Sequence, residues 1–266
     1  MPTESRAARV AVVGDNTIDR YLGEGGVDYV GGNAVNVAVQ LRRRRPGVAY
    51  FGAVGQDRDG EIVEAALRRA RLDLSGLVRL AGVTALTTIR LEGTGDRVFE
   101  SEDFGVTADY HPDADAIAVI ARARWVHLGM LPDAAALVRA LRKRDPALRI
   151  SQDCSISAGF DGLAVAFDSA GEDRARAEEL ARAAIAGGAA LAVVTMGGLG
   201  SVAYDGTTWW RQNARPARVL DTTGAGDSFA AGFIDARLDG AAIHDALAAG
   251  AAWAARTCEH LAGFPQ

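Results

Sequence analysis

Short apolar segments typical of buried strands alternate with helical segments along almost the whole chain. In the helical segments, apolar residues recur every three or four positions, which is the period of one helix face. Strands that alternate with helices predict a mainly parallel sheet with helices on both faces, so we expect a three-layer α/β/α fold. The predicted strands are residues 10–13, 49–54, 125–128, 149–152, 163–167 and 189–195. The predicted helices are residues 33–44, 59–71, 132–144, 172–186, 225–238 and 242–258, and a hairpin is predicted at 201–204 and 208–211.

Residues 85–102 depart from this alternation. Residues 87–92 alternate between two faces, a turn with two glycines follows at 93–96, and 97–101 complete the pattern of a β-hairpin. Together with residues 28–30 the hairpin predicts a small sheet that stands off the main body. Such a sheet is either a substrate lid or an edge through which two copies pair as a homodimer. We expect one domain over residues 1–266, with a β lid at about 27–31 and 85–102.

Composition narrows the classes of function. The 266 residues, 49% of them hydrophobic, suffice for one large folded domain. A net charge of −5 argues against nucleic acid as a partner, because binding phosphate backbones needs a basic surface. No apolar run approaches the ~20 residues that span a bilayer. No secretion signal is recognisable, so we expect a cytoplasmic protein without a membrane partner.

Lys143 is the only lysine in the chain, and it sits among charged residues at a predicted helix end. A mechanism that needs a buried catalytic lysine is therefore disfavoured. The chain has no GxxxxGK[ST] phosphate loop and no strand lysine of the protein-kinase type. If the protein handles phosphate, it must do so with backbone groups and arginine.

Residues 221–229 (DTTGAGDSF) open the helix predicted at 225–238, after a strand-like segment at 218–220. Gly224 and Gly226 lack a Cβ, so a ligand can approach the backbone closely. The first N–H groups of a helix have no internal partner and attract anions. Asp227 lies in the first turn, where the helix dipole is expected to keep it ionised so that it can take a hydroxyl proton. A lone Gly-x-Gly-Asp is typical of an ordinary helix start, but the whole string favours phosphoryl transfer.

Three further segments have polar residues or glycines at the start of a predicted helix or the end of a predicted strand. Asn33 and Asn36 lie three positions apart at the start of a helix, where their amides can bind polyol hydroxyls or simply cap the helix. Asp15 follows the first strand, at the end where ligands bind in open α/β sheets. The glycine-rich turn after Thr195 either runs beside a nucleotide or belongs to a plain hairpin. The GxGxxG fingerprint of NAD-binding proteins is absent after the first strand.

These segments resemble the two signatures of the ribokinase, or PfkB-type, carbohydrate kinase family. The first signature runs from residues 31–36 to 52–57 and ends at Gly60, and the second covers residues 221–227. Their order, their spacing and the chain length match over essentially the whole chain. The resemblance implies a ribokinase-like fold that phosphorylates a sugar hydroxyl with ATP. It implies that Asp227 is the catalytic base, with an anion hole of Gly224, Ala225 and Gly226. It also implies sugar contacts from Asp15, Asn16, Gly31, Gly32, Asn33 and Asn36.

The same resemblance implies residues for the nucleotide and for ions. Thr195, Gly197, Gly200 and Thr222 would line the ATP site. Mg²⁺ would accompany ATP, with Glu172 acting through water, although serine at 169 replaces the asparagine that the family often has three residues before this glutamate. Asp221 and Thr223 would hold a monovalent cation such as K⁺, on which many members do not depend.

Within the family, the chain resembles the branch that phosphorylates fructosamines such as fructoselysine, the fructoselysine 6-kinases. The matching strings are residues 14–16, 31–40, 82–85 and 96–99. Arg90, Arg97 or Glu92 of the lid would then bind the zwitterionic end of a glycated amino acid, or each arginine is a plain surface residue of a strand. The alternatives are a kinase for ribose or fructose, a nucleoside kinase with Phe99, Phe104 or Tyr110 against the base, and a sugar-binding regulator without catalysis. Retention of Asp227 argues against the last of these.

Overall fold

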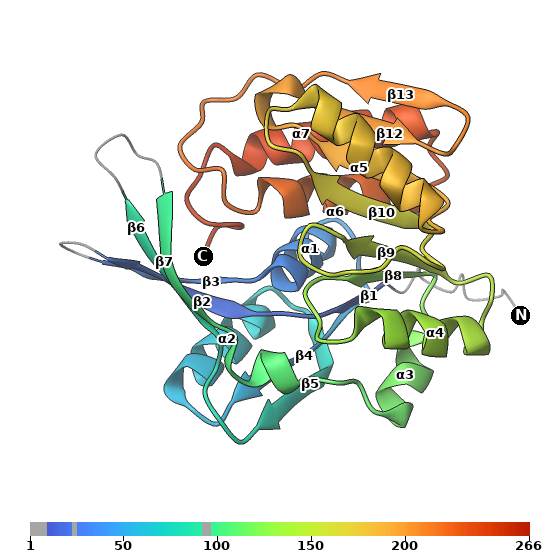
Figure 1. Cartoon of the computed structure of the whole chain (residues 1–266). Helices are drawn as coiled ribbons and strands as arrows, with labels where there is room; N and C mark the ends of the chain where they lie inside the picture. The colour runs from blue at the N-terminus through green and yellow to red at the C-terminus, as the bar shows by residue number, and fades with distance from the viewer. Residues whose placement is uncertain (1–9, 23–25, 92–96) are drawn as a thin grey trace, which may run out of the picture.

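The structure of the protein is a computed structural model that describes residues 10–22, 26–91 and 97–266, with side chains described for 10–22, 26–90 and 100–266. Its main body is a nine-stranded sheet in the order β13-β12-β11-β10-β9-β8-β1-β4-β5 (Figure 1). The pairs from β11 to β5 are parallel, and β12 and β13 add an antiparallel hairpin at one edge. The strands are β1 (Val10–Val13), β4 (Val48–Gly55), β5 (Asp73–Leu80), β8 (Trp125–Leu128), β9 (Arg149–Asp153), β10 (Val165–Ser169), β11 (Ala192–Thr195), β12 (Ser201–Tyr204) and β13 (Trp209–Gln212).

Helices cover both faces of this sheet, which confirms the expected three layers. Val10 and Val12 of β1 pack into one core cluster while Ala11 and Val13 pack into another, as the alternation of side chains along a strand requires. The first cluster takes residues from α1 (Asn33–Arg42), α2 (Arg58–Arg69), α6 (Ala225–Leu238) and α7 (Ile243–Thr257). The second takes them from α3 (Ala114–Ile120), α4 (Ala134–Arg144) and α5 (Arg174–Ala186). The 3-10 helices η1 (Gly105–Asp109) and η2 (Gly197–Leu199) lie in loops.

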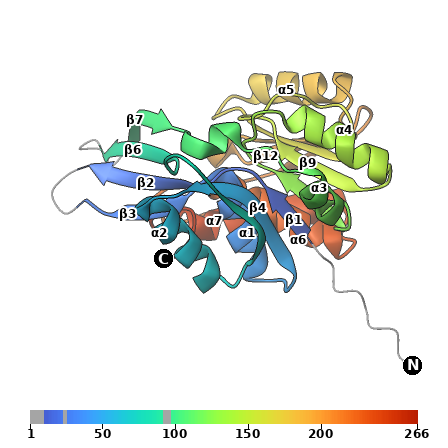
Figure 2. The same ribbon diagram turned by 90° about the horizontal axis from the view of Figure 1, so that it is seen from below.

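A second sheet projects from the side of the main body, and we call it the lid (Figure 2). Its order is β3-β2-β6-β7, and its strands are β2 (Thr17–Leu22), β3 (Asp28–Gly31), β6 (Leu86–Leu91) and β7 (Arg97–Asp103). The hairpin β6–β7 and β3 lie where the sequence predicted them. β2 was not predicted, because its sequence TIDRYL carries charged residues on both faces and lacks a clear alternation. β5 and α3 were missed as well.

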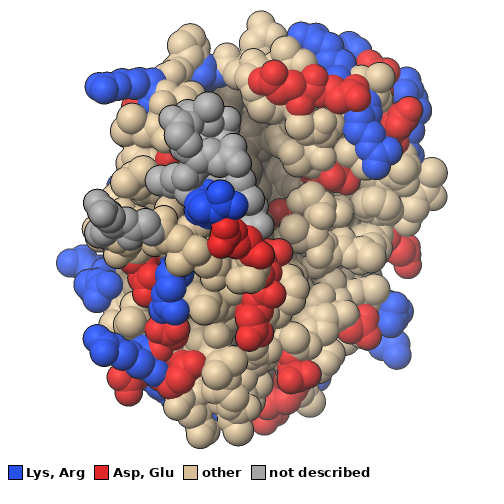
Figure 3. Space-filling view, turned by 60° about the vertical axis from the view of Figure 1, so that its left-hand side comes forward, with Lys and Arg blue, Asp and Glu red and all other residues tan. Residues whose placement is uncertain are grey.

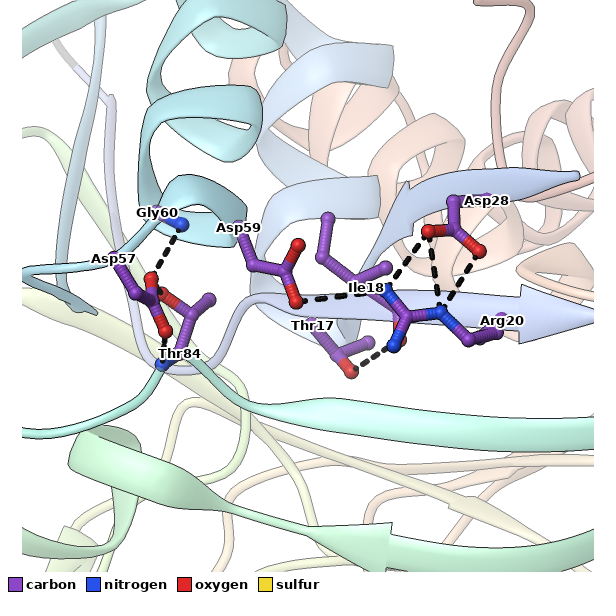
Figure 4. Close-up of polar contacts among 8 residues, drawn as sticks. All are labelled: Thr17, Ile18, Arg20, Asp28, Asp57, Asp59, Gly60 and Thr84. Carbon is purple, nitrogen blue, oxygen red and sulfur yellow. Dashed lines mark hydrogen bonds and ion pairs between the residues drawn. The ribbon is translucent and has the colours of Figure 1, made fainter.

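The base of the lid is tied to the start of α2 (Figure 4). Asp57 caps α2 by accepting from the Gly60 N–H at 2.8 Å, and it also accepts from the Thr84 N–H at 2.8 Å and the Thr84 hydroxyl at 2.7 Å. Arg20 of β2 pairs with Asp28 of β3 at 2.9 Å and with Asp59 of α2 at 3.6 Å. These contacts hold the point where the chain enters β6 against the main body, and so they fix the base of the lid.

Among the helices that the structure describes, none is long and apolar enough to cross a membrane. The last residue contacts the lid: the Gln266 side chain accepts from the Val30 N–H at 2.8 Å and donates to the Val30 carbonyl at 2.5 Å. The end of the chain therefore covers part of the β3 edge.

Candidate active site

Asp227 lies in the first turn of α6, as predicted, and its carboxylate is held by two asparagines of α1. Gly224 precedes the helix in the left-handed conformation with φ 69°, which turns the chain into α6. The Asp227 side chain is 8% exposed. One of its oxygens accepts from Asn36 at 2.8 Å, and the other accepts from Asn33 at 3.2 Å. The two amides that the sequence assigned to a sugar therefore also position this carboxylate.

Two clefts meet at Asp227. The lid cleft, about 930 Å³, lies between the lid and the starts of α1 and α6, and it reaches Asp19 and Thr87 of the lid. The glycine cleft, about 520 Å³, runs over Thr195, Gly197 and the start of α6. The residues that line both are Asn33, Val219, Thr222, Gly224 and Asp227. A ligand in each cleft would bring its reacting end to the same carboxylate.

Burial raises the pKa of Asp227 to about 8, and repulsion from the nearby carboxylate of Asp153 adds to this effect. The hydrogen bond from Asn36 acts in the opposite direction. The expectation that Asp227 is ionised at neutral pH is therefore wrong for the ligand-free protein, because burial favours the protonated carboxyl. A carboxylate whose pKa lies near the working pH is a competent general base.

The start of α6 leaves backbone N–H groups for an anion, but not all of those predicted. The Ala225 N–H donates to the Thr222 carbonyl at 3.2 Å, so Ala225 is partly withdrawn from the predicted anion hole. The N–H groups of Gly226 and Asp227 have no backbone partner within the described parts of the chain. A Cβ at Gly226 would meet nothing within 4 Å, whereas a Cβ at Gly224 would lie 2.6 Å from the Gly263 Cα. Gly224 is thus needed for packing, and Gly226 leaves room for a ligand.

Asp15 and Asn16 line the lid cleft, yet their side chains mostly serve the protein itself. The Asp15 carboxylate accepts from the backbone N–H groups of Asn33, Ala34 and Met130 at 2.6, 3.1 and 3.0 Å. The Asn16 amide group donates to the Tyr50 hydroxyl and to the Ala53 carbonyl, and only its Oδ1 is left without a partner. Direct sugar contacts from these residues remain a prediction.

The two glycines before α1 allow close approach of the backbone. A Cβ at Gly31 would lie 2.3 Å from Asp19 Oδ2, and one at Gly32 would lie 2.7 Å from the Asn16 Cα. Gly32 also has a φ of 105°, which L side chains rarely adopt. Both glycines therefore let β3 pass over the residues after β1, and only Gly32 of the two lines the lid cleft.

The glycine cleft contains the residues that the sequence assigned to ATP. Thr195, Gly197, Gly200 and Thr222 all line it. Arg215 is its one Lys or Arg lining residue in the described chain, since Lys143 lies elsewhere, in α4. His127 also lines it, but burial lowers the pKa of His127 to about 3, so that side chain is neutral.

Sequence reasoning missed two carboxylates of the glycine cleft. Asp153 ends β9 and Asp168 lies near the end of the neighbouring strand β10. Burial raises the pKa of each. A carboxylate at the carboxyl end of a parallel strand was the available signal.

Glu172, the predicted metal residue, instead accepts from the Gly198 N–H at 3.2 Å. The described residues contain no cluster of three or more His, Cys, Asp or Glu suited to a metal ion.

Two predictions around the lid cleft need revision, and the predictions for Arg97 and for Glu92, which lies outside the described residues, are not tested. Arg90 pairs with Glu100 and lies on the face of β6 opposite Thr87, so it does not line the cleft. The backbone of Arg97 belongs to β7, but its side chain lies outside the described residues. Residues 218–220 form no strand, and Val219 and Leu220 are instead exposed at the lid cleft.

The comparisons with known proteins agree with this arrangement of two clefts around Asp227. The family described as pfkB family carbohydrate kinase matches residues 8–149 and 156–263. The protein belongs to the PfkB family of carbohydrate kinases. As a member of this family the kinase is an ATP-dependent phosphotransferase that acts on a sugar.

Curated relatives and solved structures extend this result. The kinase is 36% identical over 265 residues to fructoselysine 6-kinase of Escherichia coli. The alignment covers 94% of this chain and 97% of that protein. It is 29% identical to a fructosamine kinase of Bacillus subtilis, over 94% of this chain and 90% of that protein. The fold of the kinase is similar to Arabidopsis thaliana ribokinase complexed with ribose and ATP, with a TM-score of 0.85, 20% identity, and coverage of 98% and 96% of the two chains. Ribokinase of Thermotoga maritima gives a TM-score of 0.82 at 18% identity, over 97% and 96% of the two chains. The ribokinase-like fold is thereby confirmed.

Proposed function

We propose that the kinase transfers the γ-phosphoryl group of ATP to the 6-hydroxyl of a fructosamine such as fructoselysine. The observation that carries the proposal is the position of Asp227, where the lid cleft and the glycine cleft meet. The names of the curated relatives in Escherichia coli and Bacillus subtilis support a fructosamine as the acceptor.

In this proposal the acceptor binds in the lid cleft and ATP binds in the glycine cleft. Asn33 and Asn36 hold the Asp227 carboxylate toward the acceptor hydroxyl, whose proton it takes as the oxygen attacks the γ-phosphorus. The free N–H groups of Gly226 and Asp227 donate to the oxygens of the transferring phosphoryl group, aided by the positive end of the α6 dipole. Phosphoryl transfer requires little beyond such positioning and charge stabilisation.

The glycine cleft fits a divalent cation that arrives with ATP. Asp153 and Asp168 supply carboxylate oxygens, the ligand type that Mg²⁺ prefers, and the absence of a larger protein cluster among the described residues suits an ion that keeps waters and phosphate ligands. When bound, Mg²⁺ would neutralise phosphate charge. We assign Asp153 and Asp168 to this role, with Glu172 as an indirect partner that supports the turn at Gly198.

Two further elements of the proposal concern an ion and a partner. Asp221 accepts from the Thr223 and Ala262 N–H groups at 2.6 and 2.9 Å, and the buried Thr223 hydroxyl oxygen lacks a partner, which suits a K⁺ site beside the anion hole. A homodimer through the lid remains a proposal. Gln266 already covers Val30 on the β3 edge, so pairing would use the β7 edge.

The main alternative acceptors are plain sugars such as ribose or fructose, and nucleosides. Phe104 is the residue that favours a nucleoside, because it is 42% exposed and lines the lid cleft, where a base could stack on it. Tyr110 cannot stack on a base, since it is 3% exposed in the second core cluster. A sugar-binding regulator would have no need of a positioned base.

A coupled ADP-release assay tests the proposal with fructoselysine, another fructosamine, ribose, fructose and adenosine as acceptors. We expect the highest kcat/KM with the fructosamines and a product phosphorylated at the 6-hydroxyl, identified by NMR. Equal kcat/KM on fructose or ribose would remove the fructosamine assignment. The highest kcat/KM on adenosine would replace it with nucleoside kinase activity.

A further inference from the structure

One row of side chains crosses the lid on the face that borders the lid cleft. The register pairs Tyr29 of β3 with Asp19 of β2, Asp19 with Thr87 of β6, and Thr87 with Glu102 of β7. Residues directly opposite in adjacent strands point to the same face of a sheet. Asp19, Thr87 and Glu102 all line the lid cleft. Glu102 therefore faces the lid cleft. The register shifts at Glu100, which is the extra residue of β7 opposite Thr88 and Ile89, and Glu100 pairs with Arg90 on the other face.

The ionisable side chains that line the lid cleft in the described chain are all acidic. No described Lys, Arg or His is among them. In the space-filling view the molecule is hollowed beside the lid, and acidic side chains gather at the rim of this hollow (Figure 3). A cleft of one charge sign repels ligands of that sign and attracts the opposite one. The acids are Asp15, Asp19, Glu102, Asp103, Asp221 and Asp227, of which Asp227, with its pKa of about 8, carries little of the negative charge at neutral pH.

A buried amide side chain at the same cleft has an acceptor without a partner. Asn16 is fully buried and lines the cleft, and its Oδ1 has no hydrogen-bond partner. The orientation of this amide is fixed because its NH2 group donates to the Ala53 carbonyl. A buried acceptor without a donor is unfavourable, so a hydroxyl or ammonium hydrogen that reaches this oxygen from a ligand would be favourable. The Oδ1 of Asn36 also lacks a partner, but it faces Gly263, which does not line the cleft.

Glu102 and Asp103 differ from the buried acids of the cleft because their carboxylates are largely available to a ligand. Asp15, Asp221 and Asp227 already accept hydrogen bonds from several protein groups. Glu102 and Asp103 are exposed and form no ion pair within the described residues, and the Gly105 N–H orients Asp103 at 2.9 Å. At about 930 Å³ the cleft is near the upper end of the roughly 300–1,000 Å³ typical of small-molecule sites, which leaves room for a substituent beyond a sugar ring.

We propose that Glu102 and Asp103 bind the protonated amine of the acceptor and make the kinase select cationic amino sugars over neutral and anionic ones. The inference rests on the proposed function and deepens it, because it assigns the recognition of the amine to two carboxylates of β7 in place of Arg90. The secondary ammonium of a fructosamine, attached at C1 of the sugar, is the group that they would contact when the 6-hydroxyl lies at Asp227.

The effect of charge at C1 can be measured with three sugars that differ only in the group at this carbon. They are 1-amino-1-deoxyfructose, fructose and fructose 1-phosphate. We expect kcat/KM of the wild-type kinase to fall in that order. In the Glu102→Gln/Asp103→Asn double variant, the ratio of kcat/KM for the amine to that for fructose should drop about tenfold, mainly through KM, as expected for lost charge pairs at a partly solvated site. Added salt should shrink the wild-type ratio and leave that of the variant nearly constant.

Glu100→Gln is the matched control, because Glu100 lies on the same strand but faces away from the cleft, and it should keep the wild-type ratio. Thermal unfolding of all variants verifies that they fold. Equal kcat/KM for the amine and fructose in the wild type, or an unchanged ratio in the double variant, would overturn the inference while leaving the kinase assignment intact. If no sugar stimulates ADP release, the proposed function fails, and calorimetric binding of the three sugars still decides the charge preference.

Discussion

Asn36 donates a hydrogen bond of 2.8 Å to the Asp227 carboxylate, although the two residues lie 191 positions apart in the chain. The bond joins the first turn of α1 to the first turn of α6. Asn33, one turn away from Asn36, donates to Asp227 at 3.2 Å and to Asp153 at 3.4 Å. The two signature segments are therefore one physical unit, in which the asparagines proposed to contact the acceptor also hold the carboxylate proposed as the base.

The charge of Asp153 should control the pH at which the kinase becomes active. Asp227 must lose its proton to act as a base, so kcat/KM should rise with pH toward the pKa of about 8 in the free enzyme. In Asp153→Asn the repulsion that raises the pKa of Asp227 is gone, and the rising limb of the kcat/KM profile should move to lower pH. The maximal rate itself is expected to fall if Asp153 also assists Mg²⁺.

Asp168→Asn is the control for this shift. Asp168 lines the same cleft but is not among the causes of the raised pKa of Asp227, so its removal should leave the position of the limb unchanged. A limb that stays in place in Asp153→Asn, or moves to higher pH, would disprove the electrostatic coupling of the two carboxylates.

Asp227 should lower the stability of the fold at alkaline pH. Its pKa of about 8 in the folded state lies above the ordinary value of 3.8, so the folded state binds the proton more tightly than the unfolded chain. The stabilisation that comes from this tighter proton binding is fully present below pH 3.8 and is lost as pH rises toward 8. Over this range the free energy of unfolding falls by up to about 1.4 kcal/mol per pH unit. Asp227→Asn should therefore unfold at a higher urea concentration than the wild type at pH 8.5, with the difference shrinking toward pH 5.

The exposed Asp109 provides the comparison, since Asp109→Asn removes a carboxylate that is not buried and so controls for the substitution itself. If Asp227→Asn is destabilised at pH 8.5, then burial of the charge is not the dominant effect at this site.

The two glycines at the start of α6 should respond differently to alanine. In Gly226→Ala the new methyl group meets no protein atom within 4 Å, so folding should be retained, while kcat/KM should fall roughly a hundredfold because the methyl projects into the phosphate site. In Gly224→Ala the methyl meets the Gly263 Cα at 2.6 Å and the residue keeps a φ of 69°, so the unfolding free energy should drop by more than about 1–2 kcal/mol. Urea unfolding and the ADP-release assay measure both effects. A fully active Gly226→Ala would place the phosphate elsewhere.

The sequence predicted the parts of the site that depend on local pattern. The start of α6 at Ala225 and of α1 at Asn33, and the asparagines on one face of that turn, follow from glycine placement and helix periodicity. The parallel sheet followed from the alternation of apolar and helical segments. These features are set by residues close together in the chain, which is why they could be predicted.

What the sequence did not predict depends on long-range packing. The pKa of Asp227 is raised by burial and by Asp153, and neither burial nor that proximity is visible in the sequence. Arg90 was placed in the cleft because a strand pattern does not reveal which of its two faces turns inward. Asp153 and Asp168 come from neighbouring strands that only the sheet order brings together.

The most direct test of the account compares ADP release by the wild type and by Asp227→Asn, with fructoselysine as acceptor and with acceptor binding measured separately by calorimetry. The account predicts that kcat falls by roughly 10³- to 10⁴-fold while the variant still folds and binds the acceptor, as expected for loss of a positioned base. A variant that binds the acceptor and turns over within about tenfold of the wild type would contradict the assignment of Asp227 as the catalytic base.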